Sequence, residues 1–200
     1  MSHPMRPADR VLAALTTNGF LLTQDKALPS VVGVLTGESL RTSWWSHPKS
    51  HLIFSVLSEL VEHPDVLFTK LLYRKDTLVH RSLWPAVLAV GSAREQWQVR
   101  GLSGDARRLL ERLDRGDGSV RAAGAPVKEL EERLLAVAQE IHTDSGRHEK
   151  ALETWHAWSA RVRCSAIQSV QHARKALEEA SVKLGAPLKS LPWPAKSAAA

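Results

Sequence analysis

The chain has 200 residues, of which 44% are apolar and 24% are charged, a mixture typical of a globular protein. A chain of this length can bury roughly 70% of its unfolded surface, so it needs neither disulfides nor a metal ion to fold. The single cysteine, Cys164, excludes an internal disulfide and a cysteine-based zinc site, and it favours a reducing, cytoplasmic compartment. No apolar stretch approaches the roughly 20 residues of a membrane span, and the first residues lack the apolar segment of a signal peptide. No membrane partner is therefore expected.

The formal net charge is +6 and the isoelectric point is about 9.8. Residues 1–100 contain 11 basic and 8 acidic side chains, and residues 101–200 contain 16 and 13, so each half has a charge of +3. This surplus permits contact with nucleic acid, but it forms no dense block of lysine and arginine. The net charge alone does not distinguish a protein that binds an anionic partner from one whose surface is generally basic.

The first hundred residues predict four helices and one hairpin. Asp9 can cap a helix through Leu15, and Pro29 fits the first turn of a second helix, Ser30–Leu35, which Gly37 ends. Ser46 or His47 can cap a third helix with Pro48 at its first position. Its apolar residues recur at helical spacing and are Ile53, Val56, Leu57, Leu60 and Val61. A hairpin over about 66–81 and a helix over 83–90 follow.

Three helices followed by a two-stranded hairpin resemble a winged helix, over residues 8–81. The resemblance rests on the order of the elements and implies a fold and possible DNA contact, with no particular residue assigned. The predicted fold is therefore mostly α with a small β-hairpin, a winged-helix-like N-terminal domain over 1–100 and a helical C-terminal region.

After residue 100 the sequence predicts a short helix and linker over 101–125, then a helical hairpin or three-helix region over 126–186. Pro126 opens a predicted helix to about Ile141, because apolar residues recur at helical offsets. Two further helices are predicted over about 147–162 and 166–184. Residues 187–200 are expected to form an extended or disordered tail.

The most unusual segment is residues 43–51, where two adjacent tryptophans stand beside two histidines near a predicted helix start. Amide donors at a helix start attract anions, and an indole ring can stack on a base. The candidate residues for nucleic-acid or anion binding here are Trp44, Trp45, Ser46, His47, Lys49 and His51. Simple packing of one tryptophan, with the other covering a crevice, is the alternative. A metal pair of His47 and His51 is disfavoured because His47 is expected to cap the helix.

The predicted hairpin supplies further candidates for phosphate contact, namely Lys70, Arg74, Lys75, His80 and Arg81. A solvated basic hairpin explains the same residues without any ligand. Only one of His80 and Arg81 can face a given cleft, because adjacent strand residues point to opposite faces.

Residues 140–149 combine histidines, carboxylates and an arginine in a predicted turn between helices. A structural turn explains much of this composition, and an acid–base site is the alternative. The acid–base candidates are His142, Asp144, His148, Glu149 and Glu153.

No nucleotide-binding glycine motif, HExxH, Gly-x-Ser-x-Gly or CxxC motif occurs, so no cofactor and no metal are expected. The leading hypothesis is DNA or RNA binding through the winged-helix-like domain. A small enzyme with a cleft between the two halves is the first alternative, with Trp45, His47, His51, His80, His142 and His148 lining it. The second is a helical interaction module, with a possible homodimer through the C-terminal helices.

Overall fold

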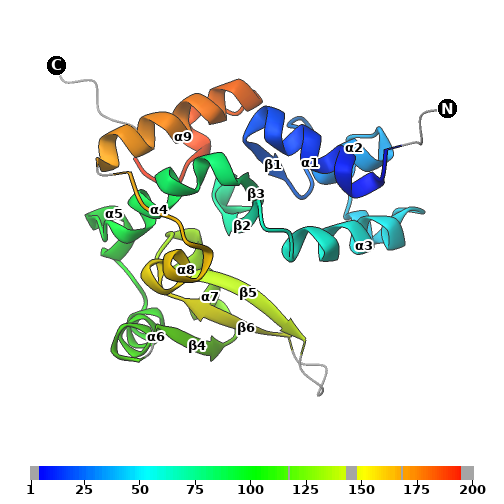
Figure 1. The fold of residues 1–200 in the computed structure, drawn as a ribbon. Helices are drawn as coiled ribbons and strands as arrows, with labels where there is room; N and C mark the ends of the chain where they lie inside the picture. The colour runs from blue at the N-terminus through cyan, green and yellow to red at the C-terminus, as the bar shows by residue number, and fades with distance from the viewer. Residues whose placement is uncertain (1–4, 117, 143–147, 168, 195–200) are drawn as a thin grey trace.

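The computed structural model describes residues 5–116, 118–142, 148–167 and 169–194. These residues form a mostly helical molecule with two small antiparallel sheets of three strands each (Figure 1). None of the described helices is both long and apolar enough to cross a bilayer.

The N-terminal part begins with α1 (Pro7–Asn18), a short strand β1 (Phe20–Leu22) and α2 (Val31–Thr36). It continues through the 3-10 turn η1 (Trp44–Ser46), α3 (Ser50–Val61), and the strands β2 (Val66–Lys70) and β3 (Asp76–His80). The 3-10 turns η2 (Leu72–Arg74) and η3 (Arg81–Leu83) precede and follow β3. The sheet order is β1-β3-β2, with Phe20 opposite Val79 and Val66 opposite His80.

Both faces of this sheet are buried, because alternate residues enter two different cores. Leu21, Leu78 and Val66 pack with the buried residues of α1, α2 and α3. Phe20, Leu22, Leu67 and Val79 pack with α4 (Trp84–Ser92), α8 (Trp155–Val162) and α9 (Val170–Leu184). The N-terminal and C-terminal parts of the chain therefore share one core at this sheet.

The second half contains α5 (Gln96–Val99), α6 (Gly104–Arg115), β4 (Ser119–Ala122) and α7 (Ala125–Glu132). The hairpin strands β5 (Val137–His142) and β6 (His148–Glu153) follow. The sheet order is β4-β6-β5, so in both sheets the last strand of the sequence lies in the middle. A third core joins α6, α7 and this sheet. Helix α9 and the 3-10 turn η4 (Leu188–Ser190) are the last of the described elements.

Several sequence predictions are confirmed. The hairpin lies where it was expected, and the second helix lies one residue later than predicted. Ser30 is its N-cap residue, whose Oγ accepts the Gly33 N–H at 3.1 Å, so Pro29 precedes the helix and is not in its first turn. Gly37, at φ 80°, ends α2 as predicted. Helices also follow the Trp44-Trp45 pair and the hairpin, and α9 matches the last predicted helix apart from its first turn.

The predicted helices over 126–141 and 147–162 are confirmed only where α7 and α8 lie, and they are wrong over residues 137–142 and 148–153, which are strands. Helix α7 ends at Glu132, and Leu134 takes a left-handed φ of 52° that no helix can continue through. Pairing of Val137 with Glu153 and of Ala138 with Leu152 then satisfies the backbone of both segments. The helical region over 126–186 therefore contains a hairpin, whereas the domain boundaries at residues 100 and 125 stay predictions.

Two smaller expectations also change. The N-cap residue of α3 is Lys49, which makes no side-chain capping bond, so neither Ser46 nor His47 caps this helix. The tail is not simply extended, because Leu188–Ser190 form the turn η4. Its Leu191 and Trp193 are buried in the main core, the one that the first sheet shares with α4, α8 and α9. Residues 195–200 lie outside the described residues.

Candidate nucleic-acid interface

The side chain of Gln24, which follows β1, makes several hydrogen bonds to the loop that leads into α3. Its Oε1 accepts the Trp44 N–H at 3.0 Å. Its Nε2 donates to the carbonyl oxygens of Leu40, at 3.4 Å, and Thr42. Ser43 adds a bond from its Oγ, which accepts the Trp45 N–H at 3.4 Å. These bonds fix the backbone from which both tryptophans project.

The two tryptophans divide their roles. Their rings are stacked, with centroids 4.0 Å apart, and Trp44 is half-buried against the core of α1, α2 and α3. Trp45 is 63% exposed, and its ring lies 5.9 Å from the ring of Phe54, which is 47% exposed. Trp44 thus packs as a structural residue, while Trp45 and Phe54 present two aromatic rings to solvent. We call Trp45 and Phe54 the aromatic platform.

Positive charge flanks the platform in the sequence, four residues before and four residues after Trp45. Arg41 and Lys49 are both exposed, and neither forms an ion pair with any described residue. His51 is exposed at the first turn of α3. His47 is half-buried, and its Nδ1 accepts the Lys49 N–H at 3.0 Å. The Nε2 atom of His47 lies 3.8 Å from a carboxylate oxygen of Glu38.

The exposed side of α3 is apolar and acidic rather than basic. From Ser50 to Val61 the helix contains no lysine or arginine, and its Glu59 forms an ion pair with Arg6. Leu52, Phe54 and Val61 are between 37% and 47% exposed. Contact with phosphates through the body of this helix is therefore poorly supported.

The basic residues of the hairpin are largely paired with carboxylates. Nζ of Lys70 lies 2.7 Å from Asp76, and Nζ of Lys75 lies 2.9 Å from Asp25. Arg81 lies 3.4 Å from Asp65 at the other end of β3, where Nδ1 of His80 is 2.9 Å from Oγ of Ser82. These contacts agree with the alternative that the hairpin is basic but binds no ligand. Among the described residues, Arg74 is the cation of the hairpin that forms no ion pair.

Of the acid–base candidates near the turn between β5 and β6, the structure describes the side chain of Glu153 alone. Asp144 lies outside the described residues, and the side chains of His142, His148 and Glu149 are likewise not described. Glu153 accepts three hydrogen bonds from the Arg161 guanidinium at 2.8–3.2 Å. It therefore has a structural partner on α8. Within the described part of the chain, no three histidine, cysteine or acidic residues are grouped to hold a metal ion.

Among the described residues, the pKa values of Asp25, Glu131 and Cys164 are shifted. Burial raises the pKa of Asp25, but hydrogen bonds from Lys75, Ala27 and Leu28 outweigh it and place the pKa below its usual value. Burial raises the pKa of Glu131, and the nearby Lys150 opposes this shift only in part. Burial also raises the pKa of the Cys164 thiol, against a smaller opposing effect of Arg81.

No protein family, curated protein or solved structure matches the chain. The interpretation of the site rests on its own chemistry. What the structure brings together is the aromatic platform and the Gln24-bound loop, with Arg41 and Lys49 near Trp45 in the sequence. Sequence reasoning found the tryptophans, Lys49 and His51, but it missed Phe54, Arg41 and Gln24. Phe54 lies seven residues before Val61, so it borders the apolar stripe of α3 on the exposed side of the helix.

Proposed function

We propose that residues 7–80 form a winged helix that binds nucleic acid by stacking unpaired bases on Trp45 and Phe54. The observation that carries the proposal is the exposed pair of aromatic rings, 5.9 Å apart. Two exposed cations, Arg41 and Lys49, flank Trp45 in the sequence. Base stacking on aromatic rings contributes about 1–3 kcal/mol per base and tolerates any sequence. Buried tryptophans supply core packing, but Trp45 is 63% exposed and contributes little to it.

The order α1-β1-α2-α3-β2-β3 and the sheet order β1-β3-β2 support the winged-helix assignment. In helix-turn-helix proteins the recognition helix usually enters the major groove of a duplex, and it commonly has basic residues for that purpose. Helix α3 holds the equivalent position but has no lysine or arginine between its ends. Single-stranded nucleic acid, which offers open base faces, is therefore the favoured ligand over a duplex.

A titration with fluorescently labelled 12-nucleotide single-stranded DNA, single-stranded RNA and duplex DNA tests this proposal. At 50 mM salt we expect single strands to bind more tightly than the duplex, with affinity falling as salt rises. The double variant Trp45→Ala, Phe54→Ala should weaken binding at least tenfold. Lys49→Gln should reduce the salt dependence, whereas Lys189→Gln makes the same charge change on η4 and should have no effect. Absence of binding to all three ligands at low salt would refute the proposal.

Self-association through α3 is a second candidate, favoured by the exposed Leu52, Phe54 and Val61. The C-terminal helix α9 is less suited to a dimer, because its Ala173, Leu177 and Leu184 already pack in the main core. Light scattering across a concentration series tests whether the protein self-associates. A Phe54→Ser variant that turns a dimer into a monomer would support self-association, and a monomeric wild-type protein would exclude it.

A further inference from the structure

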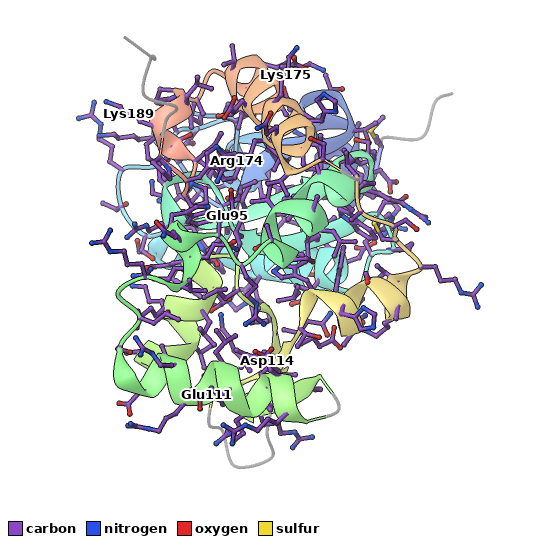
Figure 2. The ribbon with its side chains drawn as sticks, turned by 90° about the vertical axis from the view of Figure 1, so that its left-hand side faces the viewer. Glu95, Glu111, Asp114, Arg174, Lys175 and Lys189 are labelled. Carbon is purple, nitrogen blue, oxygen red and sulfur yellow. The ribbon has the colours of Figure 1, made fainter. Side chains whose placement is uncertain are left out.

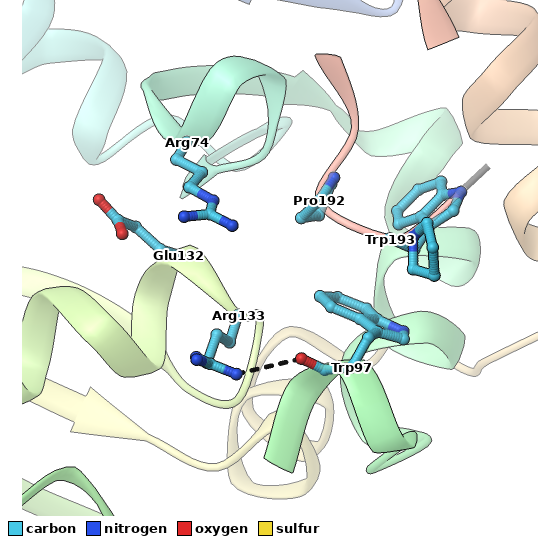
Figure 3. A pocket seen from close by; sticks show the side chains of 7 residues that line it. Arg74, Trp97, Glu132, Arg133, Pro192 and Trp193 are labelled. Carbon is cyan, nitrogen blue, oxygen red and sulfur yellow. Dashed lines mark hydrogen bonds between the residues drawn. The ribbon is translucent and has the colours of Figure 1, made fainter. Parts of the chain in front are cut away.

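A second candidate binding site is a pocket that shares no residue with the platform. It lies where four separate segments of the chain meet. Its volume is about 440 Å³, within the range of small-molecule sites. The walls come from the hairpin turn, α5, the end of α7 and the C-terminal tail (Figure 3). The lining residues are Arg74, Trp97, Glu132, Arg133, Pro192, Trp193 and Pro194.

The two aromatic walls are fixed from behind by carboxylates. The Trp97 Nε1–H donates to Glu95 at 2.9 Å, and the Trp193 Nε1–H donates to Glu178 at 3.0 Å. Arg174 links the two walls, because it forms an ion pair with Glu95 and its guanidinium carbon lies 5.5 Å from the Trp193 ring centre. Figure 2 shows Glu95 and Arg174 side by side where α5 faces α9. Both indole N–H groups are thus satisfied by these carboxylates.

The floor of the pocket is equally well supported. Arg133 donates from Nη1 to the carbonyl oxygens of Trp97, Gln98 and Arg100 at 2.9–3.3 Å. Gln98 is fully buried, and its Nε2 lies within 3.4 Å of the carbonyl oxygens of Gly91, Arg133 and Leu134. This network holds α5 and the residue after α7 in one position, so this part of the pocket is formed before any ligand binds.

Arg74 is the charged group of the pocket that has no ion pair among the described residues. Its guanidinium points into the space between Glu132, Arg133 and Pro192 (Figure 3). It extends from a two-residue turn in which Tyr73 and Arg74 both have left-handed φ values, 53° and 56°. Glu132, the one carboxylate of the lining, lies 3.7 Å from Lys128. The pocket therefore offers a net positive charge beside two rigid indole rings.

We propose that this pocket binds a small molecule with a flat aromatic ring and one anionic group, a carboxylate or a phosphate. The anionic group pairs with the Arg74 guanidinium, whose planar array of donors matches either anion. The ring of the ligand lies mainly against Trp97, because Trp193 is only 5% exposed and contributes a small part of the lining. The two prolines close the edge. This site is independent of the nucleic-acid proposal, because it shares no residue with the platform.

The seven tryptophans provide an internal readout, since each indole N–H gives its own signal in a ¹⁵N-resolved NMR spectrum. The probes are 2-naphthoate, 2-naphthamide, 1-naphthyl phosphate and inorganic phosphate. We expect 2-naphthoate and 1-naphthyl phosphate to shift the signals of Trp97 and Trp193. The neutral amide and the ring-free phosphate should each bind at least tenfold more weakly. Stronger binding of one anionic probe identifies the preferred anion.

Arg74→Gln should weaken binding of both anionic probes about tenfold or more, the effect of losing a charged hydrogen bond. Arg74→Lys should retain part of the affinity, and Arg107→Gln, the same charge change on the exposed side of α6, should retain all of it. Unchanged signals of Trp84, Trp155 and Trp158 in each variant establish that the core is intact. Equal binding of amide and carboxylate, equal binding to Arg74→Gln, or shifts confined to Trp45 would overturn the proposal.

Discussion

Gly91 of α4 and Trp155 of α8 are in such close contact that no side chain fits between them. A Cβ atom built on Gly91 would lie 2.3 Å from Cε2 of Trp155, far inside van der Waals contact. The indole cannot easily move away, because its Nε1–H donates to the Leu134 carbonyl oxygen at 2.7 Å. Trp155 also meets Trp158 edge to face, and Trp158 meets Trp84 in the same way. This aromatic cluster joins α4 and α8 above the first sheet.

Gly91→Ala should therefore destabilise the protein by about 3 kcal/mol, the upper range for overpacking a core. In a helix without steric conflict the same change would stabilise by up to about 1 kcal/mol, so the sign of the effect tests the contact. Urea unfolding measures the free energy. Gly104→Ala in the first turn of α6 is the matched control, because its Cβ would meet only Arg108, at 3.5 Å. A stabilised Gly91→Ala variant would contradict the packing.

Asp25→Asn should destabilise the protein by about 1 kcal/mol at pH 7, because the buried carboxylate loses its ion pair with Lys75. Asp25 has a lowered pKa in the folded state, so its contribution is present above the unfolded value of 3.8. The contribution is lost as the pH falls through the folded pKa. Urea unfolding of wild type and variant at pH 7 and pH 3 should show the difference shrinking at the lower pH. Asp105→Asn, which removes an exposed pair with Arg108, should change stability by less than about 0.5 kcal/mol at pH 7.

Glu131 should have the opposite pH dependence, because burial raises its pKa above the unfolded value of 4.5. Between the unfolded and the folded pKa the folded state binds more protons, so stability falls as the pH rises through that window. Glu131→Gln removes this loss, although it also removes the bonds from Lys150 at 2.9 Å. Relative to wild type, the variant should therefore gain stability as the pH rises above 4.5. Unfolding free energies at half-unit pH intervals give the slope, and parallel curves for the two proteins would exclude a raised pKa.

Gln98→Leu should destabilise the protein by about 3 kcal/mol, since it leaves buried carbonyl oxygens and the Glu95 N–H without their amide partner. The same change should also alter the NMR signal of Trp97, because the support of α5 is lost. Gln96→Leu on the exposed side of α5 is the control, with an expected change within about 0.5 kcal/mol. Equal effects of the two variants would show that the buried amide network contributes nothing specific.

The local elements of this protein follow from its sequence, because they depend on neighbouring residues. Ser30 and Gly37 define α2 at both ends, and Ser103 accepts the Ala106 N–H where α6 begins. The alternation of β2 and β3 around a short polar turn identifies the hairpin. Of the platform, Trp45 could be found from the sequence because two adjacent tryptophans cannot both enter one core.

Tertiary contacts decided the rest. The apolar residues after Leu130 fit a helix or a buried strand, and the left-handed Leu134 together with the β5–β6 pairing selects the strand. Strands β1 and β4 are only three and four residues long, too short to stand out from loops, and they exist because they pair with β3 and β6. The pocket of Arg74, Trp97 and Trp193 has no signature in the sequence, because its walls come from segments far apart in the chain. The burial of Trp193 and the hydrogen bonds of Arg133 and Gln98 bring those segments together.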